Sequence, residues 1–246
     1  IRGWSVTGVQ TCALPIFDQG KRNDAVWHIL RANIRATDLV VGDMEAQIEA
    51  ARIGAARLLG LVDRYRLDST MAAFHDLMDY SERLMRDAIR ALPDGEYSAS
   101  TMLDGYLDDP NPARRELPLV VTLKVQGDDL TVDLSGTAAQ VPDKPINMPL
   151  VGTVDCSVWL TIRSILLDTV TYGPIPQNSG LTRPITIEAP KGTLVNPIFP
   201  APVIARFCPG NQLADTVMKA FSQIVPEQVS AGIGNLRVVA LSGLRD

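Results

Sequence analysis

Apolar residues recur at steps of three and four along two long stretches between residues 43 and 92. In the first stretch we expect Asp43 to cap a helix and Glu45 to lie favourably in its first turn. The second stretch starts at Asp68 and ends before Pro93. The spacing predicts two long helices with a short loop between them, each with one buried face. The predicted inward residues are Met44, Ile48, Ala51, Ala55, Leu58, Val62 and Tyr65, then Met71, Phe74, Met78, Met85, Ile89 and Leu92.

Beyond residue 118 the apolar positions alternate instead, on both sides of a turn at Gly127-Asp128-Asp129. This pattern predicts a β-hairpin with one covered face. Three more helices are predicted at about 24–35, 153–167 and 211–224, and a short strand at 185–188. Because no regular strand–helix–strand alternation occurs, we expect an α+β fold. A long helical hairpin would come first, followed by β-hairpins, further helices and ordered loops rich in proline and glycine, and such loops often carry function.

The chain has 246 residues with a formal net charge of -5, and 46% of its residues are hydrophobic. A negative field argues against nucleic acid or an anionic membrane surface as the main partner. No apolar run is long enough to span a bilayer, because Asp155 and Arg163 interrupt the best candidate at residues 151–167. The three cysteines are widely spaced and form no CxxC pair, which suits a reducing compartment and predicts a cytoplasmic protein.

The first sixteen residues resemble neither a signal peptide nor a transit peptide. Residues 9–16 read Val-Gln-Thr-Cys-Ala-Leu-Pro-Ile, which the sequencing-adapter bases GTG CAG ACG TGT GCT CTT CCG ATC encode codon for codon. Our hypothesis is that residues 1–16 are an assembly artefact joined to a gene that is broken upstream of Phe17. They are excluded from the fold prediction, and continuous genomic reads through the junction would contradict this hypothesis.

Several motifs of known chemistry are absent from the sequence: the P-loop, the GxGxxG fingerprint, HExxH and GxSxG. His75 and Asp79 could present two metal ligands on one helical face, but a charged, solvated helix surface is the preferred interpretation. Cys156 and Cys208 have no basic neighbour in sequence, so we expect buried structural thiols. Gly210-Asn211 could bind an anion at a helix start, but an ordinary helix start is the preferred interpretation.

Small polar residues follow the second hairpin strand. The segment Asp133-Leu134-Ser135-Gly136-Thr137 opens a long loop that also holds Gln140 and Asn147. Loop amides suit an amide or carboxylate ligand, and the alternative is a strand-end turn whose side chains cap backbone groups. A cation site at Asp104, Asp108 and Asp109 is possible, but turn chemistry also explains these carboxylates.

Four groups of segments occur in an order and spacing that cover residues 23–246. They are Asn33-Ile34-Arg35 with Gly42-Asp43-Met44-Glu45-Ala46-Gln47; residues 80–86 with 92–97; residues 132–137 with Pro145-Ile146-Asn147 and residues 176–180; and Pro202-Val203-Ile204 with Asn211, Asp215 and Pro226-Glu227. Together they resemble the hydantoinase B/oxoprolinase family. No single motif is decisive, but the ordered set is specific.

The resemblance implies a B-type subunit that works with an A-type subunit, an actin-like ATPase that binds ATP and is either separate or fused. The implied activity is ATP-dependent opening of a small cyclic amide such as a hydantoin, 5-oxoproline or a lactam. An acetone or acetophenone carboxylase-type subunit is the alternative enzyme, and a non-catalytic assembly subunit is the alternative outside enzymes. This chain alone is expected to be inactive.

The resemblance also implies where the chemistry lies. The family's metal ligands, His and Asp residues, precede the region that begins near Asn23, and a glycine-rich segment follows the region matched here. Residues 17–246 are therefore expected to be an incomplete hydantoinase B-type domain. A divalent metal is expected in the complete protein, and no metal ligand is assigned in this chain. Five residues match family-pattern positions and are candidates for substrate binding or for framing loops: Asp133, Ser135, Asn147, Asn178 and Asn211.

Overall fold

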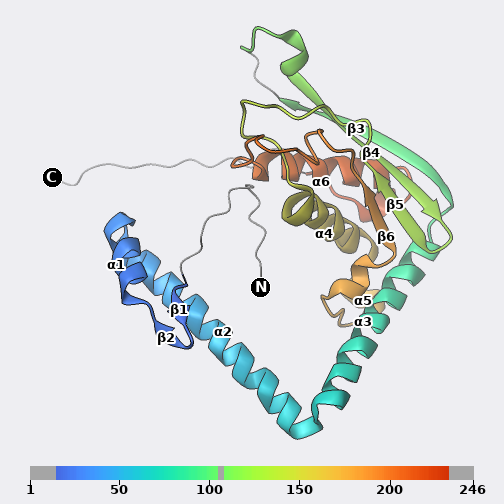
Figure 1. Cartoon of the computed structure of the whole chain (residues 1–246). Coiled ribbons are helices and arrows are strands. Elements are labelled where there is room, and N and C mark those ends of the chain that lie inside the picture. The colour runs from blue at the N-terminus through green and yellow to red at the C-terminus, as the bar shows by residue number, and fades with distance from the viewer. Residues whose placement is uncertain (1–14, 105–107, 233–246) are drawn as a thin grey trace. The chain divides into compact units, whose positions relative to one another are not determined.

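The computed structural model describes residues 15–104 and 108–232, which fall into two compact units divided between His75 and Asp76. Figure 1 follows the chain through both units. The adapter hypothesis falls almost entirely on residues 1–14, which lie outside the described residues, so it stays a prediction. The closing stretch from residue 233 lies outside them as well, and so does the side chain of Asp104.

The first unit consists of a small β-ribbon and helices. Its elements are β1 (Phe17–Asp18), antiparallel to β2 (Lys21–Arg22), then α1 (Asp24–Asn33), α2 (Thr37–Tyr65) and the first residues of α3 (Leu67–Arg90). The side chain of Asn23 caps α1 by accepting a hydrogen bond from the Val26 N–H at 3.4 Å. Arg66, at a φ of 68°, separates α2 from α3. The two long helices and the short junction between them are therefore confirmed.

The predicted cap at Asp43 is wrong, because α2 begins at Thr37 and Asp43 lies inside the helix. Apolar residues at positions 39–41 continue the helical pattern toward the N-terminus, and no proline stops it. The predicted buried face of α2 is also wrong for the described residues: Leu58 is 45% exposed and Tyr65 is 50% exposed. Periodicity shows which side of a helix suits an apolar neighbour, not whether the chain itself supplies that neighbour.

The second unit contains a four-stranded sheet in the order β3-β4-β5-β6. The strands are β3 (Gly95–Asp104), β4 (Glu116–Gln126), β5 (Asp129–Asp133) and β6 (Ile185–Glu188). Neighbours pair antiparallel except β5 and β6, which are parallel. The hairpin of β4 and β5 and the strand β6 are confirmed. Strand β3 was not predicted, because small polar residues such as Ser98 and Ser100 interrupt its apolar pattern at the sheet edge.

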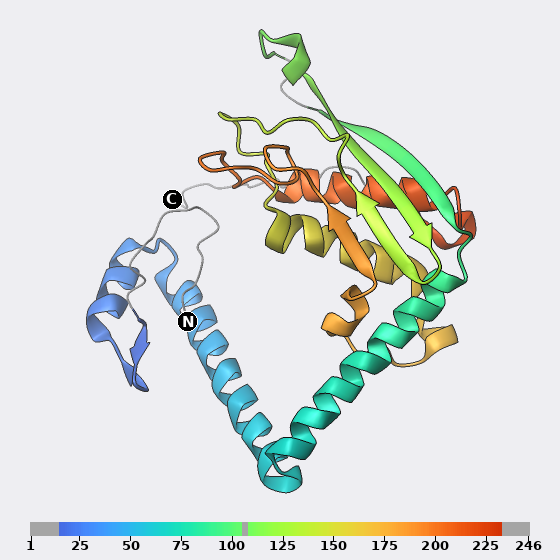
Figure 2. The same ribbon diagram turned by 45° about the vertical axis from the view of Figure 1, so that its right-hand side comes forward.

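Two helices form the core with this sheet, as Figure 2 shows. Helix α6 (Phe207–Phe221) packs on β3 and β4, and α4 (Asp155–Leu166) packs on α6. The remaining elements are α5 (Thr169–Tyr172) and short turns at Leu150–Val154, Ser179–Thr182, Pro112–Arg114 and Pro226–Gln228. The second half of α3 adds Met85 and Ile89, both fully buried. The α+β class is thus confirmed.

Helix α6 begins four residues before its predicted start, so Gly210 and Asn211 lie inside it. Pro209 is tolerated in the first turn, where its missing N–H would have had no helical partner. The Gly210 N–H already donates to the Arg206 carbonyl at 3.0 Å. An anion site that uses a free N–H at this position is therefore ruled out, and Gly210-Asn211 is ordinary helix, although not the helix start.

Candidate functional site

The carboxyl ends of β5 and β6 form the candidate site. Because the two strands are parallel, Asp133 and Glu188 lie opposite each other at the same edge of the sheet. Lys124 of β4 lies beside them: its Nζ is 2.8 Å from Asp133 Oδ2 and 3.6 Å from Glu188 Oε2. One ammonium group therefore holds two carboxylates at this edge.

Asp133 is fixed in its ionised form. The hydrogen bond from Lys124, followed by hydrogen bonds from Ser135, lowers the pKa of Asp133 to about 2. The Ser135 backbone N–H donates to Asp133 Oδ1 at 2.9 Å. In return, Asp133 raises the pKa of Lys124. A carboxylate this acidic is too weak a base to activate the Ser135 hydroxyl at neutral pH, so the group suits positioning rather than proton transfer.

We expect this pair to make the stability of the second unit depend on pH. The folded-state pKa of Asp133 lies below its ordinary value, so its contribution is present above about pH 4 and is lost as the pH falls toward 2. The shift corresponds to about 2 kcal/mol. Urea unfolding should show Asp133→Asn less stable by that amount at neutral pH and nearly equal to wild type at the lowest pH. A constant gap between the two proteins at every pH would contradict the assignment.

A matched control is Asp63→Asn, because Asp63 is an exposed carboxylate of α2 for which the described residues show no ion pair. This substitution removes the same charge and should leave the pH dependence of unfolding of the second unit unchanged.

Two long loops leave this edge, residues 134–149 after β5 and residues 189–206 after β6, and we call them together the loop layer (Figure 2). Backbone bonds join the two loops: Gln140 N–H donates to the Gly192 carbonyl at 2.8 Å and Leu194 N–H to the Ala138 carbonyl at 2.9 Å. Met148 N–H donates to the Leu194 carbonyl at 2.7 Å. The loops therefore form one ordered surface, as the sequence predicted for this region.

Asn147 lies at the centre of the loop layer and is 0% exposed. Its Oδ1 accepts a hydrogen bond from Val141 N–H at 2.8 Å. Its Nδ2 donates to the carbonyls of Val141 and Pro202, each at 2.8 Å, and of Lys144 at 3.1 Å. The side chain thus joins one loop to the other. This geometry favours the loop-framing interpretation, although direct substrate contact at this position stays a prediction.

The other candidate residues lie elsewhere. Asn178 precedes β6 and therefore lies at the opposite end of the sheet from Asp133. Its Oδ1 accepts from Gly180 N–H, and its Nδ2 donates to Ser81 Oγ of α3, both at 2.8 Å. Asn211 is half-buried in α6. The structure thus brings Asp133, Ser135 and the loop of Asn147 to one edge, and it leaves Asn178 at the other.

Lys124 and Glu188 were missed as candidate site residues, whereas Gln140 was noted as a loop amide. The alternating pattern of the strand could have identified Lys124, because this residue occupies an outward position between the inward Leu123 and Val125. Gln140 joins the loops through Ile198, whose N–H donates to its Oε1 at 2.6 Å. Sequence gives no sign of that contact, because it joins residues far apart in the chain.

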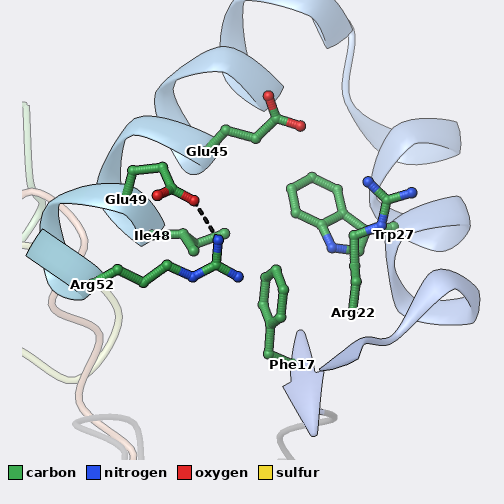
Figure 3. Close-up of a pocket in the computed structure, with 7 residues that line it drawn as sticks. All are labelled: Phe17, Arg22, Trp27, Glu45, Ile48, Glu49 and Arg52. Carbon is green, nitrogen blue, oxygen red and sulfur yellow. Dashed lines mark hydrogen bonds and ion pairs between the residues drawn. The ribbon is translucent and has the colours of Figure 1, made fainter. Parts of the chain in front are cut away.

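A pocket of about 470 Å³ lies in the first unit (Figure 3). Its lining residues are Phe17, Arg22, Trp27, Glu45, Ile48, Glu49 and Arg52. The Arg52 guanidinium covers the Phe17 ring at 5.1 Å and pairs with Glu49, and Arg22 lies 5.7 Å from the Trp27 ring centroid. Both arginines lie against aromatic rings, and four of the seven lining residues are exposed, so the pocket is an open hollow at the surface of the first unit.

The remaining candidate chemistry has structural explanations. Asp79 pairs with Arg183 at 2.6 Å, and the Asp109 carboxylate accepts from Asn111 N–H at 2.9 Å, as in an Asx turn. The expectation of a buried Cys156 is wrong, because its thiol is exposed at the start of α4. Partial desolvation and then Asp155 raise the pKa of Cys156, which disfavours a reactive thiolate.

Within the described residues, 15–104 and 108–232, the His, Cys, Asp and Glu side chains form no group of three or more that could hold a metal ion. None of the helices in this part of the chain has the length and apolarity needed to cross a membrane.

Comparison with known proteins identifies relatives along nearly the whole chain. The family model described as hydantoinase B/oxoprolinase matches residues 6–246, and the match begins within residues 1–16, so the junction at Phe17 stays a prediction. A Pseudomonas sp. (strain NS671) protein, named as the B-type subunit of a D-/L-hydantoinase, is 64% identical over 236 residues, covering 96% of this chain and 40% of that protein.

Two solved structures share the fold. ATP-dependent caprolactamase from Pseudomonas jessenii matches with a TM-score of 0.74 and 31% identity, over 87% of this chain and 35% of that one. Acetone carboxylase in its nucleotide-free form has the same TM-score of 0.74 at 14% identity, over 88% of this chain and 30% of that one, and so supports the fold alone. The chain spans about two fifths of the length of the hydantoinase and caprolactamase subunits that it matches.

Proposed function

We propose, from the premise that this chain belongs to the hydantoinase B/oxoprolinase family, that its complete protein is the B-type subunit of an ATP-dependent cyclic amide hydrolase. The observation that carries the proposal is the 64% identity to a hydantoinase B-type protein over 96% of the chain. The likeness to an ATP-dependent caprolactamase at 31% identity supports the same reaction class.

The chemistry of a ring amide explains the need for ATP. Resonance makes the amide carbonyl a weak electrophile, so phosphorylation of the ring substrate by an A-type ATPase subunit would activate it. The B-type subunit would then receive the phosphorylated intermediate. Two relatives are each named as one subunit of a larger enzyme, a hydantoinase and a caprolactamase, and these names support the assignment to a multi-subunit enzyme.

Within this chain we assign the loop layer a supporting role. Asp133 and Ser135 lie where the loop layer begins, and Asn147 fixes the distance between its two loops. We infer that these residues shape one wall of the substrate site, and that Asn178 and Asn211 act through the packing of α3 and α6. The divalent metal expected in the complete protein would take ligands from outside residues 17–246.

Two alternatives belong to different classes. Acetone carboxylase shares the fold, so a carboxylase-type subunit is the alternative enzyme. An assembly subunit without catalytic residues is the alternative outside enzymes. We also propose that the protein is cytoplasmic and that neither nucleic acid nor a membrane is its partner. These expectations rest on the composition of the sequence alone.

The deciding experiment uses the complete gene co-expressed with its A-type neighbour. Phosphate release from ATP is followed with hydantoin, 5-oxoproline or caprolactam, and separately with acetone and bicarbonate. We expect a cyclic amide to stimulate ATP hydrolysis at least tenfold over the A-type subunit alone. Stimulation only by acetone with bicarbonate would favour the carboxylase, and stimulation by neither would favour an assembly role.

A further inference from the structure

The second half of α2 and the start of α3 carry apolar side chains that the described residues leave uncovered. In α3, for example, Leu67 is 57% exposed and Met71 is 45% exposed. A helix of a globular protein normally buries such residues against a neighbour. We call them together the bare face, and all of them except the half-buried Val62 are exposed. They are Ala51, Ala55, Leu58, Leu61, Val62, Tyr65, Leu67, Met71 and Phe74.

Both helices bury the other end of the same apolar pattern. The β-ribbon and α1 lie beside the first half of α2 (Figure 1), where Val41 is buried and Ile48 lines the hollow. Steps of three and four continue along α3 into Met85 and Ile89, which are fully buried. A helix in water gains most of its stability from packing of its apolar side. The bare face therefore requires a neighbour that the described residues do not supply.

The composition of the bare face indicates what kind of neighbour fits it. None of its side chains carries a charge at neutral pH, and the charged residues Arg57, Asp63 and Arg64 fall at other positions of the helical repeat. Interfaces that form and dissociate are about as polar as the rest of a protein surface, whereas permanently buried ones resemble a core. An apolar face of this extent left in water also favours aggregation. Its neighbour is therefore apolar and covers it permanently.

We propose that the bare face is covered by an apolar segment of the complete B-type subunit that lies outside these 246 residues. The chain matches 40% of the hydantoinase subunit and 39% of the caprolactamase subunit, so about three fifths of each relative lies outside the match. A segment of the same polypeptide meets the face at high effective concentration, before any partner chain arrives. This inference rests on the proposed function in one respect, that the complete protein is a longer B-type subunit.

The test uses the complete B-type subunit, purified without the A-type subunit. Leu58→Cys or Met71→Cys places a thiol on the bare face, and peptide mass spectrometry follows its reaction with a maleimide. The matched control is Asp63→Cys, which places a thiol on the charged side of α2. Both thiols on the bare face should react about tenfold more slowly than the control or slower still, because only a locally opened state exposes them. This difference should be the same at every protein concentration.

Three outcomes would overturn the proposal. If the thiols on the bare face react as fast as the control thiol, nothing covers this face in the complete subunit. If protection appears only as the protein concentration rises, the cover is a second copy of the subunit. If protection appears only after the A-type subunit is added, the face binds that partner instead.

A second measurement needs no substitution. Hydrogen exchange of the complete wild-type subunit reports on the backbone amides of residues 53–65, with the buried strand β4 as the internal reference. We expect exchange within about a hundredfold of that in β4, and faster exchange would overturn the proposal, because an unpacked helix opens readily. Neither measurement involves ATP or a substrate. Failure of the bare-face proposal would therefore leave the proposed function to be decided by ATP-dependent turnover.

Discussion

Replacing Gly180 with alanine is expected to lower the free energy of unfolding of the second unit by about 3 kcal/mol. The reason is that the added methyl group would overlap backbone atoms that are already closely packed. A Cβ at this position would lie 1.9 Å from the Met78 carbonyl oxygen and 2.7 Å from the carbonyl carbon. These are backbone atoms of α3, so no side-chain rotation relieves the overlap. Urea unfolding followed by circular dichroism measures the loss.

The substitution should displace the whole turn Ser179–Thr182 from α3. Asn178, which caps this turn, donates to Ser81 Oγ at 2.8 Å, and Ser81 Oγ in turn donates to the Pro176 carbonyl at 3.3 Å. Leu181, almost completely buried in the turn, would move with it. The loss therefore combines a steric term with broken hydrogen bonds and exposed apolar surface.

Gly60→Ala is the matched control for this prediction. A Cβ on Gly60 would meet no atom within 4 Å, and the residue lies in the interior of α2. Alanine is the better helix former, so this substitution should stabilise by about 0.5–1 kcal/mol or leave stability unchanged. Equal stability of Gly180→Ala and wild type would show that the turn does not dock on α3 as closely as the structure places it.

The parts of the fold that sequence predicted well are those with local causes. Alternation around Gly127 identified β4 and β5, because one face of that hairpin is buried and the turn residue adopts a positive φ of 63°. The strand Ile185–Glu188 was bounded correctly by proline and glycine on its N-terminal side. The ordered family segments gave the family, which the match over residues 6–246 confirms.

The parts that failed depend on contacts between distant residues. Strand β3 has a weak apolar pattern and is held by its pairing with β4 and by α6, whose Lys219 donates to the Ser100 carbonyl at 2.9 Å. Asp43 satisfied the local rule for a cap, yet the helix continued through it because its preceding residues also favour helix. Local rules therefore located elements better than they located element ends.

The candidate site was predicted only in part for the same reason. The end of β5 at Asp133 was visible in the sequence, whereas the carboxylate of Glu188 is brought there by a parallel pairing across more than fifty residues. Asn147 was identified as a loop amide, but its bond to Pro202 across the loop layer was not foreseeable. Local sequence thus indicated which side chains are special, and topology decided which of them meet.

Replacing Asn147 with alanine is expected to lower the free energy of unfolding by about 3 kcal/mol or more, since it leaves several buried backbone groups without partners. Val141 N–H loses its acceptor, and the carbonyls of Val141, Lys144 and Pro202 lose a donor. Buried amide and carbonyl groups carry the full cost of desolvation once their partner is removed. Equilibrium unfolding in urea measures this loss.

Asn147→Asp separates the hydrogen bonds from the volume of the side chain. The carboxylate has the same shape and still accepts from Val141 N–H, but it faces carbonyl oxygens where the amide donated, so we expect a loss as large as that of alanine. Gln140→Ala, which removes a more exposed link between the same loops, should cost about 1 kcal/mol. If both Asn147 variants unfold as wild type does while the complete enzyme loses affinity for its substrate, Asn147 is a binding residue and the loops hold without it. If stability falls first, the amide frames the site, and any loss of activity follows from the displaced loop layer.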